Sequence, residues 1–81
     1  MKNDIKKMIS DELKQLRFNH GLTQNQLSNL CGVDTSTIVR YEKNNVTMQI
    51  DTIIKILDAY EIDIFIFFEN VLAKTQNKRG D

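Results

Sequence analysis

Hydrophobic residues recur at intervals of three and four positions near the start of the chain, the spacing of one face of an amphipathic helix. The stripe consists of Ile5, Met8, Ile9, Leu13 and Leu16. It predicts a helix over about residues 4–19. Gly21 follows this segment and favours the left-handed backbone conformation that ends a helix.

A second helix is predicted after this glycine. Thr23 suits its N-cap, and Gln26 three residues later completes a capping-box pattern. The expected buried face consists of Leu27, Leu30 and Cys31. Gly32 ends this helix.

Two further helices are predicted beyond Gly32. Asp34 is the expected cap of the third helix, with Ile38 and Tyr41 facing inward at helical spacing, and residues 43–45 form a turn. The fourth helix spans about residues 50–60. Its expected buried residues are Ile50, Ile53, Ile54, Leu57 and Tyr60.

The segment at residues 62–68 fits two structures. Isoleucines at alternate positions, together with β-favouring residues, suggest a strand. Asp63 is instead a good helix N-cap, and Phe65, Phe68 and Leu72 fall on one helical face. The helix is the preferred prediction, and it gives an all-α, five-helix domain; an intermolecular strand is the alternative.

Size and composition limit the chain to one small domain without internal cross-links. With 81 residues, 41% of them hydrophobic, it has enough material for one core. Cys31 is the only cysteine, so no internal disulfide forms, and no Cys/His cluster has metal-ligand spacing. We expect no metal, no cofactor and no enzymatic activity. The domain is expected over residues 1–75, with a flexible polar tail at 76–81.

The chain shows no membrane or export signal. Its longest apolar run, residues 64–68, is far shorter than the roughly 20 residues of a spanning helix. The first residues alternate charged and apolar types and do not resemble a signal peptide. We therefore expect a cytoplasmic protein.

The net charge is zero, which by itself argues against a polyanionic partner, but the charges are unevenly distributed. Residues 13–49 carry four basic and two acidic residues, a net charge of +2. Residues 50–73 carry one basic and five acidic residues, a net charge of −4. The first segment can face a polyanion while the second faces away from it.

The second and third predicted helices match the requirements of a helix-turn-helix. In this motif the second of the two helices, here the third predicted helix of the chain, enters the major groove. A small residue and a turn glycine set the angle between the two helices. Ser28 is the small residue and Gly32 the turn residue. The apolar residues expected to lock the angle are Leu27, Cys31, Val33 and Ile38.

Together these residues resemble the phage-repressor type of helix-turn-helix proteins, the Cro/C1 or XRE-like family. The resemblance covers about residues 13–68, from LKQLRFNHGLTQNQLSNLCGVDTSTIVRYEKNN to IDTIIKILDAYEID. Ser28 replaces the usual alanine and Asn44 the usual glycine; both are compatible with the fold. The C-terminal DIFIFFENVL is similar to that of controller proteins of restriction-modification systems, which are helical dimers. Some antitoxins share the first four helices but end in a strand.

The resemblance places base-reading residues in the third helix. Thr35, Ser36 and Arg40 correspond to the family's base contacts, and arginine can hydrogen-bond guanine O6 and N7 together. Thr37 and Val39 are candidates for a further hydroxyl or methyl contact with a base.

The resemblance also implies phosphate contacts. Gln24 would hold a phosphate at the start of the second helix, where the helix N-terminus is partly positive. The other candidates for backbone contacts are Arg17, Thr23, Lys43, Asn44 and Asn45. Arg17 and Glu42 correspond to an internal ion pair of the family.

The apolar cluster near the C-terminus exceeds what one helix face of so small a monomer can bury. It consists of Phe65, Phe67, Phe68, Val71 and Leu72. Part of it can cover the core, and the rest would form an exposed patch typical of a partner surface. A two-fold homodimer would bury the patch and place two reading helices about 34 Å apart, one turn of DNA.

The sequence therefore predicts a transcription regulator that binds double-stranded DNA at a palindromic operator as a homodimer, such as a restriction-modification controller protein. Two alternatives stay open. One is an antitoxin that captures a partner toxin, and the other is a protein-interaction module that has lost DNA binding. RNA polymerase is a further expected partner of a regulator.

Overall fold

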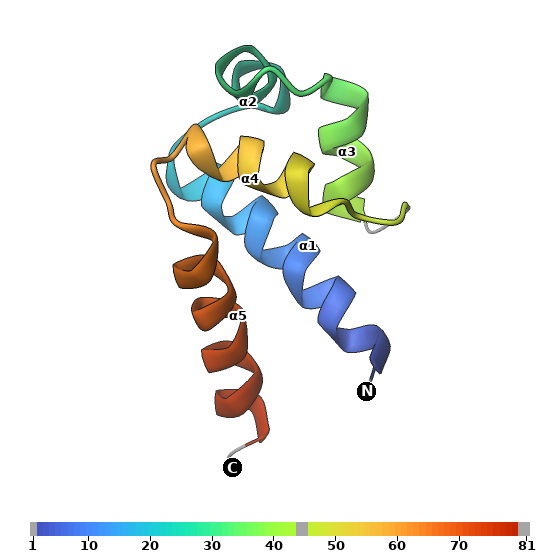
Figure 1. The fold of residues 1–81 in the computed structure, drawn as a ribbon, viewed down its shortest axis with the longest axis vertical. Helices are drawn as coiled ribbons and strands as arrows, with labels where there is room; N and C mark the ends of the chain where they lie inside the picture. Colours follow the sequence, from blue (N-terminus) through green and yellow to red (C-terminus); the bar gives the residue numbers. More distant parts are fainter. Residues whose placement is uncertain (1, 44–45, 80–81) are drawn as a thin grey trace.

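The computed structural model describes residues 2–43 and 46–79, and five helices occupy most of this range (Figure 1). They are α1 (Lys2–Asn19), α2 (Gln24–Cys31), α3 (Thr35–Lys43), α4 (Ile50–Asp58) and α5 (Ile64–Arg79). The two described ranges contain no strand. The prediction of an all-α, five-helix domain is confirmed.

Local sequence signals explain where the central helices begin and end. The Thr23 hydroxyl accepts a hydrogen bond from the Gln26 amide, and the Gln26 side chain accepts one from the Thr23 amide, which completes the predicted capping box. Gly32 ends α2 in the left-handed conformation, with φ of 76°, and Gly21 adopts φ of 67°. The Asp34 carbonyl accepts the amides of Thr37 and Ile38 at the start of α3.

The core draws on all five helices. Its buried members are Leu13, Leu27, Val33, Ile38, Tyr41, Ile53, Ile56, Leu57, Phe67 and Val71. The Tyr41 hydroxyl also accepts a hydrogen bond from the Gln49 amide at 2.9 Å, so this core residue holds the segment before α4.

Three residues that the sequence placed inside are exposed, and one buried hydrophobic residue of α4 was missed. Leu30, Ile50 and Ile54 all lie at the surface, whereas Ile56 is buried. On α4 the apolar stripe is wider than the face that packs against the rest of the chain, so its edge is left at the surface. Periodicity locates the stripe but not which part of it is covered.

The ambiguous segment is helical. The Asp63 side chain accepts a hydrogen bond from the Phe65 amide at 2.7 Å, the contact expected of an N-cap. Glu61 precedes it in the turn after α4, with a positive φ of 58°. The helix continues to Arg79, into the segment where a flexible tail was predicted.

The predicted interface cluster on α5 divides between the inside and the outside of the chain. Phe67 is 1% and Val71 3% exposed, so these two residues belong to the core and the prediction that they form a dimer surface is wrong. Phe68 is half-buried against the core. Phe65 and Leu72, in contrast, are exposed at 75% and 52%.

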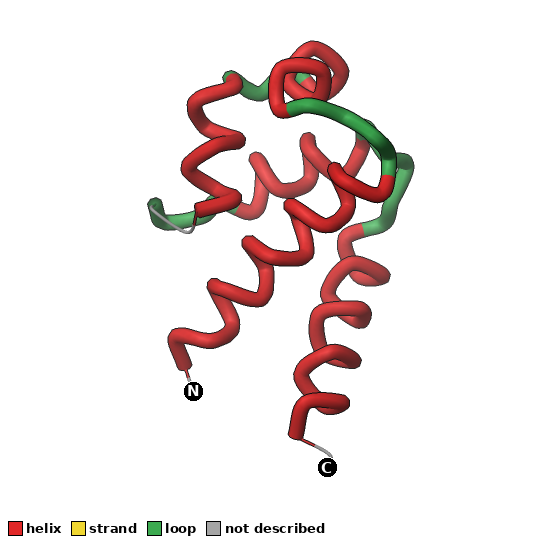
Figure 2. The backbone as a smooth tube through the Cα atoms, turned by 180° about the vertical axis from the view of Figure 1, so that it is seen from behind, coloured by secondary structure: helices red, strands yellow, loops and turns green. Residues whose placement is uncertain are grey.

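The two ends of the molecule carry different elements. The α2–α3 pair lies at one end of the long axis, and α5 runs toward the other end, where both chain termini lie (Figures 1 and 2). Between the two ends, α1 packs against α3 and α5, and α4 packs against α2 and α5. Both ends therefore share one core, within overall extents of 39 × 24 × 21 Å.

Candidate nucleic-acid interface

One side of α3 is available to a partner. Its buried residues are Ile38, Tyr41 and Glu42. Ser36 and Arg40, one helical turn apart, are both exposed and therefore project from the same side. Thr35, Thr37 and Val39 are each half-exposed. The five residues predicted to read bases thus all reach the surface: three short hydroxyl side chains, one valine and one guanidinium.

The first residue of α3 is linked to α2 by a contact that the sequence did not reveal. The Thr35 hydroxyl donates a hydrogen bond to the Asn25 side-chain oxygen at 2.9 Å. Asn25 is exposed in the first turn of α2. The contact spans two helices, so no local sequence pattern could have identified it.

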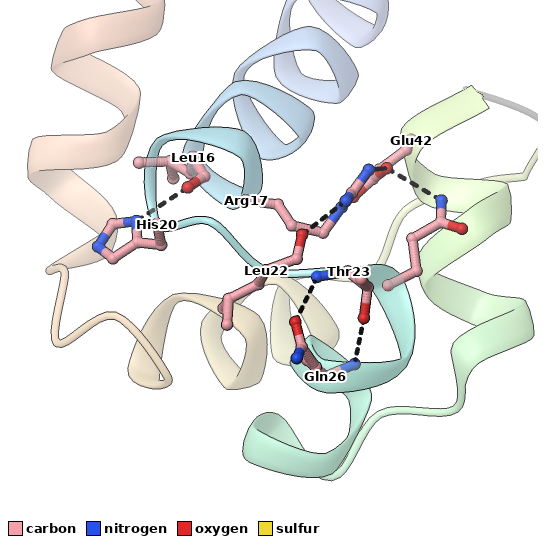
Figure 3. A network of polar contacts seen from close by, with 8 residues as sticks. Leu16, Arg17, His20, Leu22, Thr23, Gln26 and Glu42 are labelled. Atoms are coloured by element: carbon pink, nitrogen blue, oxygen red, sulfur yellow. Dashed lines mark hydrogen bonds and ion pairs between the residues drawn. The ribbon is translucent and has the colours of Figure 1, made fainter.

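The relative positions of α1, α2 and α3 are held by a buried polar network around Glu42 (Figure 3). Arg17 at the end of α1 donates from Nε and Nη2 to the two carboxylate oxygens of Glu42, at 2.8 and 2.9 Å. Its Nη1 donates to the Leu22 carbonyl at 2.8 Å. Gln24 adds a hydrogen bond from Nε2 to Glu42 at 3.1 Å. The structure thus contains the ion pair that the resemblance implied.

This network is nearly closed to solvent. Arg17 is 8% and Glu42 7% exposed. The hydrogen bonding of Arg17 to Glu42 raises the pKa of Arg17 further above its usual value, although burial opposes this. A two-pronged arginine–carboxylate pair fixes direction as well as distance, so it sets the orientation of α3 relative to α1.

Two residues predicted to contact phosphates, Arg17 and Gln24, are instead partly or fully engaged in hydrogen bonds within the protein. Arg17 uses three of its nitrogens inside the protein, so its guanidinium acts as an internal support and presents little surface to a phosphate. Gln24 is half-buried with its amide held by Glu42.

The other predicted phosphate contacts have different surroundings. Thr23, the N-cap of α2, and Lys43, the last residue of α3, are both exposed. Asn44 and Asn45 lie outside the described residues.

A ring pair joins the ends of α1 and α4 next to the network. His20 and Tyr60 have ring centroids 4.5 Å apart, and His20 Nδ1 lies 2.8 Å from the Leu16 carbonyl oxygen. Burial raises the pKa of Tyr60 to about 12, and the negative charge of Glu42 acts in the same direction. His20 is exposed and makes both of these contacts.

A second, apolar surface lies on α5, away from α3. We define the α5 surface as Phe65, Ile66 and Leu72, all exposed. Phe65 and Leu72 are seven positions apart, two helical turns, so both project from the same side of the helix. On α4, Ile50 and Ile54 are also exposed, one turn apart.

Two features are absent from the described ranges: a cluster of metal-binding side chains and a membrane-spanning helix. Within residues 2–43 and 46–79, no three His, Cys, Asp or Glu side chains are grouped so that they could hold a metal ion. None of the helices described there combines the length and apolar character needed to cross a membrane.

Similar folds occur among solved structures. The wild-type restriction-modification controller protein C.Esp1396I aligns with a TM-score of 0.82 over 90% of this chain and 95% of its own, at 23% identity. A variant of that protein aligns with a TM-score of 0.80 over 95% of this chain and 97% of its own, also at 23% identity. A search of the curated proteins found no match.

The comparison with protein families identifies the motif directly. The helix-turn-helix family matches residues 13–67, which include α2, α3, α4, the last seven residues of α1 and the first four of α5, and nearly coincide with the predicted range of 13–68. The match spans more than half of the 81 residues. The chain therefore belongs to the helix-turn-helix family and is a DNA-binding transcription regulator.

Proposed function

We propose that this protein binds a palindromic operator as a homodimer, with one α3 from each copy in successive major grooves. Ser36 and Arg40 are the central base-reading residues, with Thr35, Thr37 and Val39 beside them. The observation that carries the proposal is the exposed side of α3, where short polar side chains surround one arginine and no large hydrophobic residue is exposed.

The side chains on this face suit base edges. A helix fits the major groove of B-DNA, and its N-terminal residues meet the bases first. Side chains as short as serine and threonine let the helix backbone approach the base pairs. Arg40 lies one turn further along, where its longer side chain can span the remaining distance to guanine O6 and N7.

Contacts with phosphates would set the position of α3 in the groove without reading sequence. We assign this role to Gln24, Thr23 and Lys43, together with Asn44 and Asn45. Gln24 donates one hydrogen bond from Nε2 to Glu42. The second N–H of the Gln24 amide is then available to donate to a phosphate. Arg17 is left out of this set because its guanidinium is buried.

The α5 surface is the proposed contact between the two copies. Phe65, Ile66 and Leu72 are exposed large hydrophobic residues on one element, and contiguous exposed apolar area commonly marks a partner surface. A two-fold contact pairs each patch with its own copy. Because α5 points away from α2 and α3, the contact would leave both reading helices uncovered.

A role as a restriction-modification controller is the most specific version of this proposal. It is supported by the likeness of the fold to C.Esp1396I, which is such a controller protein. A strand at residues 62–68 would have favoured the antitoxin alternative, and that segment is helical from Ile64 onward.

Selection and titration test the DNA-binding proposal. Purified protein would select duplexes from a pool with a randomised interior, and affinity for the selected and a scrambled duplex would be measured at two salt concentrations. We expect a palindromic consensus, tighter binding of the selected duplex, and affinity that falls steeply with salt. Lys55, exposed on α4, is not one of the proposed DNA contacts and provides the control: Lys55→Ala should retain both affinity and preference. Failure to enrich any sequence, or affinity indifferent to salt, would refute the proposal.

A further inference from the structure

We infer that Asn25 is a positioning residue that fixes the hydrogen-bonding polarity of Thr35, so that Thr35 reads a base as an acceptor. The inference rests on the proposed function and names how one of its reading residues discriminates. No role for Asn25 follows from the helix-turn-helix pattern of the sequence.

The chemistry of the contact gives its direction. The Thr35 oxygen lies 2.9 Å from the amide oxygen of Asn25. A carbonyl oxygen carries no proton, so the hydroxyl proton must point toward Asn25. The lone pairs of the hydroxyl oxygen are then the only polar groups that Thr35 can offer to a base.

A free threonine would be far less selective. Its hydroxyl rotates and can donate or accept, so it tolerates either kind of group on a base edge. In the major groove the hydrogen-bond donors are the N4 amino group of cytosine and the N6 amino group of adenine. Thr35 held by Asn25 should therefore contact one of these amino groups and reject the acceptors of guanine and thymine.

Gln24 and Asn25, neighbours in the first turn of α2, contact different parts of the protein. Gln24, one position earlier, is turned to Glu42 through its amide nitrogen and is half-buried. Asn25 is exposed in the same helical turn and reaches the first residue of α3. The two amides thus have separate roles: Gln24 meets the buried network, and Asn25 meets the reading helix.

Three variants and one modified duplex test the inference. Thr35→Val keeps the shape but removes the hydroxyl, and its altered base preference in selection identifies the base pair that Thr35 faces. At that pair, Asn25→Ala should reduce discrimination by about twofold to tenfold, the range of one hydrogen bond. Asn25→Asp keeps an acceptor for the hydroxyl, so it should retain the preference while its negative charge weakens binding to every duplex.

The modified duplex tests the polarity itself. It carries purine in place of adenine, or 2-pyrimidinone in place of cytosine, which removes only the amino group. We expect the wild-type protein to lose about twofold to tenfold in affinity and Thr35→Val to lose none. In the Thr35→Val background, Asn25→Ala should have no further effect on preference, because the two residues act as one unit.

Several results would overturn the inference. If Asn25→Ala weakens binding equally on all duplexes, Asn25 is a phosphate contact. If it lowers the melting temperature without changing base preference, its role is structural. If loss of the amino group leaves the affinity unchanged but a 7-deazapurine base, which lacks the N7 acceptor, lowers it, Thr35 donates a hydrogen bond to the base. Failure of the wild-type protein to prefer any sequence would instead refute the proposed function, and it would appear before any variant is compared.

Discussion

The two ends of this molecule are built on opposite principles. At the α2–α3 end, polar contacts with defined directions hold the helices: Arg17 and Gln24 converge on Glu42, and Thr35 bonds to Asn25. At the α5 end, apolar packing predominates beside one ion pair, between Lys74 of α5 and Glu12 of α1. There Phe67 fills the core while its neighbour Phe65 lies 75% exposed.

This difference matches the demands of two kinds of binding. Reading base edges requires donors and acceptors placed to within a fraction of an ångström, and directional hydrogen bonds provide that placement. Joining two copies requires apolar area more than exact direction. The buried face of α5 and the α5 surface therefore both consist of large hydrophobic residues, and burial alone distinguishes the roles of the two sets.

The largest expected effect comes from breaking the buried polar network. Arg17→Ala would leave the Glu42 carboxylate buried without its cation, which costs about 3–5 kcal/mol of unfolding free energy. Lys7→Ala is the control, because it removes a cation from an ion pair whose side chains are 69% and 59% exposed. That loss should be about 0.3–0.5 kcal/mol. Urea denaturation of both variants measures the difference, and equal losses would contradict a structural role for the network.

The next effect separates the two neighbouring phenylalanines of α5. Phe67→Ala should lower the unfolding free energy by about 3–5 kcal/mol, since it empties a fully buried site. Phe65→Ala should leave the monomer folded but weaken self-association by about 2 kcal/mol or more if Phe65 anchors the contact. Sedimentation equilibrium and circular dichroism report the two effects. A Phe65→Ala protein that associates as strongly as the wild type would exclude the proposed dimer surface.

At the other end, Arg40 and Lys43 should differ in kind. Arg40→Ala is expected to weaken binding to the selected duplex by about 1–3 kcal/mol and to relax preference at one position. Lys43→Ala should weaken binding to all duplexes similarly and reduce the slope of affinity against salt by about one. Titrations at several salt concentrations compare them. A uniform loss for Arg40→Ala would identify it as a phosphate contact.

The smallest effect is expected at the junction of α1 and α4. The pKa of Tyr60 is raised from 10.0 to about 12 in the folded protein. Between these pH values the unfolded chain loses the phenol proton while the folded chain retains it, so stability should decline as pH rises.

Tyr60→Phe should lack this component and cost little at neutral pH, since the buried Tyr60 hydroxyl has no hydrogen-bond partner in the described part of the chain. Urea denaturation at several pH values tests both statements. Parallel declines in the two proteins would show that Tyr60 is not responsible.

Much of the fold could be predicted because its signals are local. Thr23 and Gln26 are three residues apart, and Gly32 acts on its own backbone, so helix ends followed from neighbouring residues alone. The burial of Ile56 instead of Ile50 and Ile54 depends on how α4 packs against other helices, which periodicity does not contain. The burial of Phe67 and the exposure of Phe65 likewise depend on how α5 packs against the other helices.

The candidate site shows the same limit. The exposed side of α3 could be placed because it is the complement of a short buried stripe. The hydrogen bonds of Asn25 to Thr35 and of Gln24 to Glu42 join residues 10 and 18 positions apart, and they arise only when helices from separate segments meet. For the contact between Thr35 and Asn25, the position of both polar residues in the first turns of consecutive helices was the one available signal.

One measurement compares both ends at once. Backbone amide shifts of the ¹⁵N-labelled protein would be followed while the selected duplex is added. We expect the largest changes in the first turns of α2 and α3 and at Arg40, with the α5 surface unaffected. Changes concentrated at Phe65, Ile66 and Leu72, with α3 unperturbed, would contradict the assignment of DNA reading to α3.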